Sequence, residues 1–163
     1  MARTLVVCFS RTGHTQGIAD RVAKALGADL EVITEKHSRR GIIGYLRSGW
    51  QASRHFEPRI EASRFDPFEY DLVVIGTPIW NFSLSSPVRS YLSAHKGAFK
   101  EVAYFCTCGG RGDAKVFAQM TAVTGRLPQA TLTIREAELD KPDLATRIDA
   151  FTSKLKQRAA RAA

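Results

Sequence analysis

Residues 5–15, LVVCFSRTGHT, contain the pattern that decides the fold. Leu5 to Phe9 form a nearly continuous apolar run, as a strand buried in a parallel sheet requires. A polar turn follows, and from Thr15 to Leu26 apolar residues recur four positions apart, which predicts a helix with one apolar face. Gly27 then marks the end of this helix. A buried strand followed at once by an amphipathic helix predicts the first unit of an α/β sheet.

The same alternation continues along the rest of the chain. Further strands are predicted at residues 30–34, 70–76, 102–108 and 130–134, and further helices at 88–95, 113–123 and 144–155. Five strands with helices between them predict a parallel sheet covered by helices on both faces. A length of 163 residues fits one full core, so we expect a single domain over residues 1–163. Ligands of such sheets bind at the carboxyl ends of the strands, where the strand order reverses.

Composition excludes several classes of protein. No apolar run reaches the roughly 18 residues of a membrane span, and the start of the chain lacks a secretion signal, so we expect a cytoplasmic protein with no membrane partner. Three cysteines do not indicate a disulfide framework, and four scattered histidines do not indicate a metal site. A net charge of +8 suits an anionic partner, but no stretch forms a basic arm, so nucleic acid is not expected.

The polar turn after the first strand has the features of an anion site. Ser10, Thr12 and Thr15 offer hydroxyl groups around Gly13, where the helix begins. The free amides and the positive end of the dipole at a helix start stabilise a phosphate. The turn lacks the Gly-Lys-Ser/Thr ending of a triphosphate loop and the three glycines of a dinucleotide loop. It therefore favours a single phosphate, and a capped turn without a ligand is the alternative.

Two further loops follow predicted strands at the same edge. Residues 76–83, GTPIWNFS, are expected to form an irregular loop whose Trp80 or Phe82 could cover a flat ring or else fill the core. Residues 107–113, TCGGRGD, expose amides at their glycines and allow a ligand to approach closely. Cys106 and Cys108 beside this loop are expected to point to opposite faces of their strand, which disfavours a disulfide.

This pattern resembles that of the flavodoxin-like flavoproteins, from Leu5 to about Leu155. Ser-x-Thr-Gly-x-Thr resembles their loop for the phosphate of flavin mononucleotide (FMN), and Gly-x-Pro-Ile-Trp is similar to their second flavin loop. The resemblance implies a three-layer α/β/α fold with a five-stranded parallel sheet of order 2-1-3-4-5, an order for which flavodoxin is itself a standard example. It also implies FMN as the cofactor, with the phosphate at Ser10, Thr12, Gly13, His14 and Thr15, the ring at Pro78, Ile79, Trp80, Asn81 and Phe82, and the pyrimidine end at Thr107, Cys108, Gly109 and Gly110.

Two features depart from typical flavodoxins. Electron-carrier flavodoxins are acidic, whereas this chain is strongly basic. The connection at residues 35–69 is long and rich in arginine, and residues 41–53 within it are predicted to form an amphipathic helix. We interpret the arginines first as a solvated surface; the alternative is a patch for the phosphates of NADPH or for an acidic redox partner. Tyr45 and Trp50 could pack on the sheet, line a substrate pocket or form a homodimer contact.

The resemblance leaves more than one function open. The first is an FMN-dependent oxidoreductase that takes hydride from NAD(P)H and reduces a quinone or a similar acceptor; the basic charge favours it because nicotinamide donors are anionic. The second is an electron carrier that docks to a protein partner. A third, a non-catalytic interaction module, would use the fold alone. No residue stands out as a catalytic acid or base, so catalytic residues are not assigned.

Overall fold

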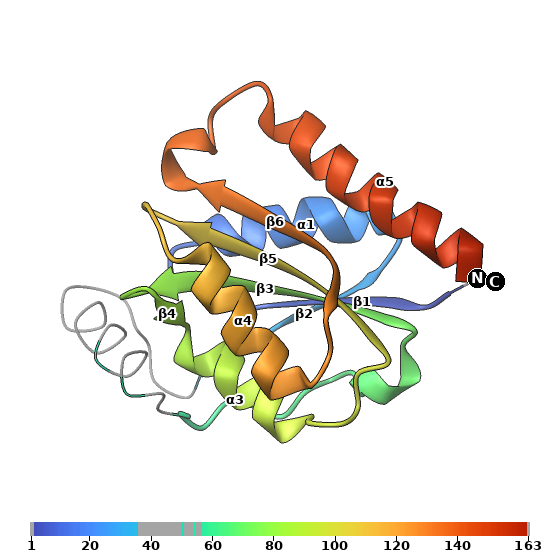
Figure 1. Ribbon diagram of the computed structural model, residues 1–163. Helices are drawn as coiled ribbons and strands as arrows, with labels where there is room; N and C mark the ends of the chain where they lie inside the picture. Colours follow the sequence, from blue (N-terminus) through green and yellow to red (C-terminus); the bar gives the residue numbers. More distant parts are fainter. Residues whose placement is uncertain (1, 36–49, 51–53, 55–56, 163) are drawn as a thin grey trace.

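The computed structural model describes residues 2–35, 50, 54 and 57–162, and these form a sheet with helices on both faces (Figure 1). Five parallel strands lie in the order β2-β1-β3-β5-β6, with bounds β2 Asp29–Val32, β1 Thr4–Cys8, β3 Leu72–Trp80, β5 Glu101–Cys108 and β6 Pro128–Arg135. With the strands numbered as in the prediction, this is the order 2-1-3-4-5. The predicted fold class is therefore confirmed.

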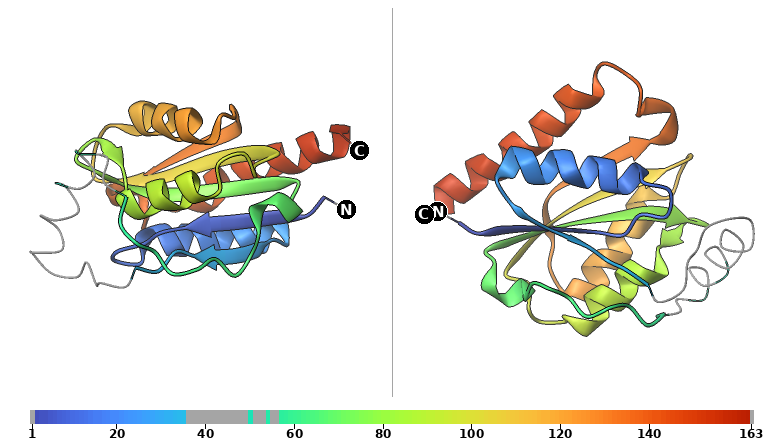
Figure 2. Two further views of the ribbon diagram at one scale, coloured as in Figure 1. Left: turned by 90° about the horizontal axis from the view of Figure 1, so that it is seen from below. Right: turned by 180° about the vertical axis from the view of Figure 1, so that it is seen from behind.

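In the described part of the chain, a pair of helices covers each face of the sheet (Figure 2). α1 (His14–Leu26) and α5 (Leu144–Ala162) lie side by side on one face, and α3 (Ser86–Ala94) and α4 (Asp113–Thr124) lie on the other. Because side chains alternate along a strand, each strand supplies two separate cores. Tyr104 of β5 packs with the α3 and α4 side, whereas its neighbour Phe105 packs with the α1 and α5 side.

β3 is longer than the sequence predicted. Instead of an irregular loop at residues 76–83, the strand continues through Pro78 and turns back in a tight hairpin into β4 (Ser83–Leu84), which pairs antiparallel with it. The turn residues Asn81 and Phe82 both have positive φ, 47° and 56°. The prediction was wrong because a proline inside an apolar run normally indicates that a strand has ended. Here Pro78 stays in parallel register with β5, which brings the second loop beside the third.

A glycine in β3 permits a very close contact inside the sheet. Gly76 lies against the ring of Phe105 on β5, and a Cβ atom at residue 76 would come within 2.0 Å of that ring. Both residues are buried. The aromatic ring thus occupies the space that any side chain at position 76 would need.

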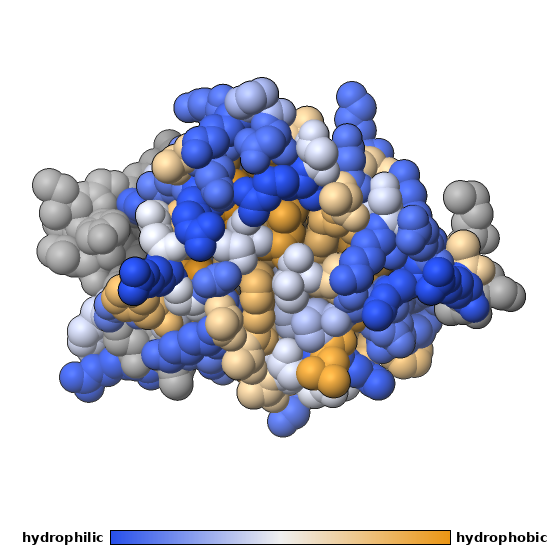
Figure 3. Space-filling model, turned by 45° about the horizontal axis from the view of Figure 1, so that its top comes forward, coloured by the Kyte–Doolittle hydropathy of each residue, from blue (hydrophilic) through white to orange (hydrophobic). Residues whose placement is uncertain are grey.

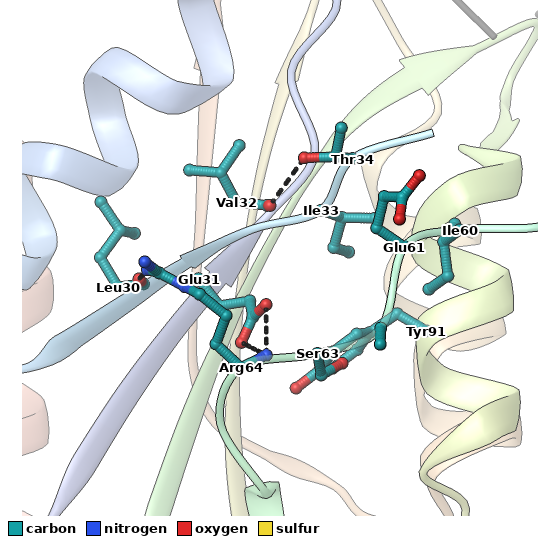
Figure 4. A pocket seen from close by; sticks show the side chains of 11 residues that line it. Leu30, Glu31, Val32, Ile33, Thr34, Ile60, Glu61, Ser63, Arg64 and Tyr91 are labelled. Atoms are coloured by element: carbon teal, nitrogen blue, oxygen red, sulfur yellow. Dashed lines mark hydrogen bonds between the residues drawn. The ribbon is translucent and has the colours of Figure 1, made fainter. Parts of the chain in front are cut away.

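The connection after β2 is held at two points to the chain at and just after that edge strand, and Figure 4 shows one of them, the contact of Glu31 with Arg64. Glu35 forms an antiparallel bridge with Ile60, and the buried carboxylate of Glu31 accepts the backbone N–H groups of Arg64 and Phe65 at 3.1 Å. Between these two points the chain leaves a cavity of about 460 Å³ at the sheet edge. None of the three predicted ligand loops lines this cavity.

The predicted helix at residues 41–53 lies outside the described residues, apart from Trp50. The ring of Trp50 is 57% exposed, and the guanidinium of Arg54 lies 5.4 Å from its centre. Within the described ranges, no helix has the length and apolar character needed to span a membrane.

Candidate functional site

A cavity of about 320 Å³ lies at the carboxyl ends of β1, β3 and β5. The strand order reverses between β1 and β3, and open α/β sheets bind their ligands at such a point. The structure brings all three predicted loops to this cavity, together with one segment that was not predicted. The lining residues are Arg11, Thr12, His14 and Thr15 from the first loop, Pro78, Ile79 and Trp80 from β3, Thr107, Cys108 and Gly109 from the end of β5, and Glu136 after β6.

The first loop forms an open cradle before α1. Gly13 has a φ of 99°, a left-handed conformation that favours glycine, and a Cβ atom there would meet no other atom within 4 Å. The N–H of Gly13 donates to the Ser10 hydroxyl at 3.0 Å, which braces the turn. No side chain caps α1, so its first amide groups remain for a ligand. Open space, a helix N-terminus and the exposed hydroxyl of Thr12 together fit a phosphate group.

Thr15 joins the first loop to the third. Its buried hydroxyl lies 2.7 Å from the hydroxyl of Thr107 at the end of β5. Thr12, in contrast, is exposed at the cavity. The two threonines of the predicted phosphate motif therefore differ, because Thr15 also holds two walls of the cavity together.

Trp80 combines the two roles that the sequence offered as alternatives. Its side chain is only 8% exposed and belongs to the core between the sheet and the α3–α4 layer. Its ring meets Phe9 edge to face, with 5.5 Å between the ring centres. The same residue borders the cavity, so core packing and a ligand-facing edge coexist at one side chain.

The hairpin tip stands at the rim of the site. Phe82 at this tip is 58% exposed, and its backbone has positive φ. A Cβ atom at Gly112 would lie 3.2 Å from the Cα of Phe82, so the hairpin touches the glycine-rich loop before α4. The predicted site residues that do not line the cavity are Ser10, Gly13, Asn81, Phe82 and Gly110.

Two lining residues were missed by sequence reasoning. Arg11 was not among the predicted site residues, but it is half-buried and lines the cavity. Glu136 begins a short 3-10 helix (η2, Glu136–Glu138) after β6, and the ends of only three strands had been considered. The preceding Arg135 donates through Nε to the Gly110 carbonyl at 3.2 Å, which ties this segment to the third loop. The available signal for Glu136 was its place directly after β6, the strand that lies beside β5 in the sheet.

Cys106 and Cys108 contradict the expectation that they point to opposite faces. Residues two apart in a strand lie on the same face, so both thiols lie on one side of the sheet. Interaction with the Cys106 thiol is the main cause that lowers the pKa of Cys108 to about 7, against the effect of burial and with help from the charge of Arg135. The described residues contain no cluster of three or more potential metal ligands.

The chain is similar to known proteins in its sequence family and in its fold. The flavodoxin family model matches residues 3–134. A flavoprotein from Lactobacillus acidophilus NCFM, crystallised in complex with FMN, is 22% identical, with a TM-score of 0.72 over 86% of this chain and 98% of that chain. Flavodoxin 2 from Bacillus cereus is 20% identical, with a TM-score of 0.64 over 96% of this chain and 99% of that one. A WrbA-like flavodoxin from Agrobacterium tumefaciens is 15% identical, with a TM-score of 0.55 over 96% and 99%. No curated protein matches the sequence.

Proposed function

Because the chain belongs to the flavodoxin family, we propose that its cavity holds FMN and that the protein is an oxidoreductase that takes electrons from NAD(P)H. One observation carries the proposal: three loops meet at one cavity in the order of the flavin loops of the family. The L. acidophilus neighbour, crystallised with FMN, supports the choice of cofactor. A quinone or a similar small molecule is the proposed acceptor.

The phosphate of FMN is proposed to lie over Gly13, against the first turn of α1. The amides of that turn and the hydroxyl of Thr12 donate hydrogen bonds, and Arg11 supplies positive charge at the cavity. The cradle has one helix start and one glycine turn, so it suits one phosphate group. We therefore expect FMN and not a flavin dinucleotide.

The flat ring is proposed to lie between the ends of β3 and β5. Pro78 and Ile79 form one wall, Thr107 and Cys108 the other, and Gly109 allows close approach of the backbone. When bound, FMN supplies a ring that accepts hydride from a nicotinamide and passes electrons to the acceptor. Amides of the glycine-rich loop stabilise negative charge at the pyrimidine end of such a ring, which favours its reduced form.

A carrier function is the second candidate, and the exposed tip of the hairpin favours it. Phe82 presents an apolar ring at the rim, 58% exposed, and aromatic residues of this kind are enriched where proteins dock. An enzyme for small acceptors has no need of such a contact. The two candidates share the cofactor and differ in what receives the electrons.

Two glycines provide a matched test of the FMN site. Gly13 and Gly97 both have positive φ, 99° and 87°, and both have open space where a Cβ would lie. Gly97, however, precedes β5 and lies at the amino ends of the strands, away from the cavity at their carboxyl ends. We expect Gly13→Ala and Gly97→Ala to lower the free energy of unfolding of the apoprotein by a similar ~1 kcal/mol. Only Gly13→Ala should weaken FMN binding, by about tenfold or more, or ~1.4 kcal/mol. Equal affinities in a fluorescence titration would place the phosphate elsewhere.

Steady-state assays separate the enzyme from the carrier. FMN-loaded protein should oxidise NADPH or NADH and reduce a soluble benzoquinone over many turnovers. A carrier would bind FMN equally well but show no turnover with either nicotinamide until a reductase protein is added. Absence of turnover, together with reduction by an added flavoprotein reductase, would replace the first candidate with the second.

A further inference from the structure

The end of β5 carries two cysteines, Cys106 and Cys108, on the face of the sheet that α3 and α4 cover. In the sheet, Cys106 lies opposite Thr133 and Cys108 lies opposite Arg135 on β6. The Cys106 thiol is 3.7 Å from the Thr133 hydroxyl, which donates to the carboxylate of Asp113 at 3.0 Å. The sulfur of Cys108 is 3.6 Å from the Gly110 carbonyl. These contacts fix both sulfur atoms beside the N-terminus of α4.

The two thiols differ in acidity. The interaction between the two thiols lowers the pKa of Cys108 to about 7, while the same interaction and then burial raise the pKa of Cys106. Burial raises the pKa of Cys8, the third cysteine, to about 12. Since the thiolate is the nucleophilic form, Cys108 is the reactive sulfur of the three.

The three cysteines also differ in access. Cys108 lines the 320 Å³ cavity and is 4% exposed, whereas Cys8 and Cys106 are fully buried. The cavity therefore gives a small hydroperoxide access to the sulfur of Cys108. Cys106 does not line this cavity.

We propose that Cys106 and Cys108 form a hydroperoxide-reactive dithiol, in which Cys108 is oxidised first and Cys106 closes a disulfide with it. The Cys108 thiolate attacks one oxygen of the hydroperoxide, the O–O bond breaks, and the products are a sulfenic acid and hydroxide or an alkoxide. The Cys106 sulfur then attacks the Cys108 sulfur, releasing the oxygen as water. Two thiols lose two electrons and two protons in total, and the hydroperoxide is reduced to water or an alcohol and water.

Disulfide closure has a structural consequence at the cavity. In an extended strand the Cα atoms of residues two apart are about 6.6 Å from each other, whereas a disulfide favours about 5.5–6 Å and brings the Cβ atoms to about 3.8 Å. Cys108 is the last residue of β5, and Gly109 and Gly110 follow it, so the chain can bend there. The bend moves residues 108 and 109, which line the cavity. The oxidised protein should therefore bind the ligand of this cavity more weakly.

The first test uses the full-length protein without added flavin. Hydrogen peroxide is added at pH 7, free thiols are blocked with N-ethylmaleimide, and the peptides are analysed by mass spectrometry without reduction. We expect the peptide with Cys106 and Cys108 to lose two hydrogens and escape alkylation, and Cys8 to be alkylated only after unfolding. Unchanged thiols, disulfides between chains, or wild-type Cys108 that stops at sulfenic or sulfinic acid would each overturn the proposal.

Two substitutions at Cys106 separate its two roles. Cys106→Ser keeps a hydroxyl that can donate to Cys108, whereas Cys106→Ala removes the donor. Both should stop the reaction at a sulfenic acid that dimedone traps. Cys106→Ala should also react with peroxide at pH 7 about tenfold more slowly and move the midpoint of its pH–rate profile toward that of an ordinary thiol. Equal profiles in the two variants would exclude the activating role of Cys106.

A separate arm measures FMN affinity in the reduced and the oxidised protein. We expect oxidation to weaken FMN binding by the wild-type protein about tenfold, and dithiothreitol to restore it fully. In Cys108→Ser, peroxide treatment should leave the affinity at the value of the untreated variant. Equal affinities would exclude the coupling of the dithiol to the cavity. If neither form binds FMN, the proposed function fails. The proposed disulfide is still tested by the peptide mass analysis, which does not depend on FMN.

Discussion

The hydroxyl pair of Thr15 and Thr107 can be tested as a unit through the stability of the apoprotein. Thr15→Val leaves the buried Thr107 hydroxyl without its partner at 2.7 Å, so we expect a loss of ~1–3 kcal/mol in the free energy of unfolding. Thr15→Val combined with Thr107→Val removes both polar groups and should recover part of that loss. Urea unfolding of the single and double variants measures the coupling. Strictly additive losses would show that the two hydroxyls do not depend on each other.

Single residues also mark the limit of what the sequence allowed. Gly13 was predictable, because a glycine between hydroxyl residues at a helix start suits both a turn and a phosphate. Trp80 was not, because whether an indole faces a ligand or the core depends on Phe9, which is distant in the sequence and meets it edge to face. Glu136 was missed since a carboxylate at a strand end has no local pattern to distinguish it.

At the scale of secondary-structure elements, the β3–β4 hairpin stores backbone strain. Phe82 has a φ of 56°, which costs a bulky side chain about 1 kcal/mol or more, and glycine is the preferred residue at the second position of such a turn. We expect Phe82→Gly to raise the free energy of unfolding by ~1 kcal/mol, because glycine relieves this strain. Loss of the ring costs little since Phe82 is mostly exposed. Asn81→Gly is the control and should gain less, since asparagine tolerates positive φ. A destabilised Phe82→Gly variant in urea unfolding would contradict this account.

The contact between β3 and β5 predicts a pair of compensating substitutions. Gly76→Ala places a Cβ atom within 2.0 Å of the Phe105 ring, so we expect a loss of ~3 kcal/mol as the strands or the ring are displaced. Phe105→Leu alone should destabilise the core by leaving space. Combining the two should cost less than the sum of the single losses, as measured by denaturant unfolding. Additive losses would mean that the ring and the glycine do not share the space.

The elements were predictable to the extent that they bury a regular stripe of residues. α1 and α5 repeat apolar residues along one face, and β1 and β5 are continuous apolar runs, so period and length identified them. The extension of β3 and the pairing of β4 were not predictable, because Pro78 ends most strands and a two-residue strand has no period. The alternation of β5 was misread at Cys106 and Cys108, where a period of two places both thiols on one face.

At the scale of the whole molecule, the positive charge bears on the proposed donor. Hydrophilic side chains cover much of the face in Figure 3, the net charge is +8, and arginines 11, 111 and 135 lie at or beside the cavity loops. We expect kcat/KM for NADPH to fall with ionic strength because salt screens this attraction. Arg111→Glu should lower kcat/KM several-fold at low salt and flatten the salt dependence.

Lys154→Glu provides the control for that charge change. Lys154 is an exposed residue of α5. The C-terminal end of this helix lies near the N-terminus of the chain, on the side of the amino ends of the strands, whereas the cavity is at their carboxyl ends (Figure 1). The variant makes the same change in net charge. Equal effects of the two substitutions on the salt dependence would assign the attraction to the net charge alone.

The pairing of β1 with β3 has a consequence for the newly made chain. Thr4 lies opposite Leu72, and the N–H of Arg3 donates to the carboxylate of Asp71, 68 positions further along. At a synthesis rate of about 5–20 residues per second, the apolar first strand leaves the ribosome roughly 3–14 s before its central partner does. Throughout that interval one edge of Leu5 to Cys8 has no strand to pair with. The nascent chain is therefore a target for chaperones that bind extended apolar segments, and slower translation lengthens the exposure.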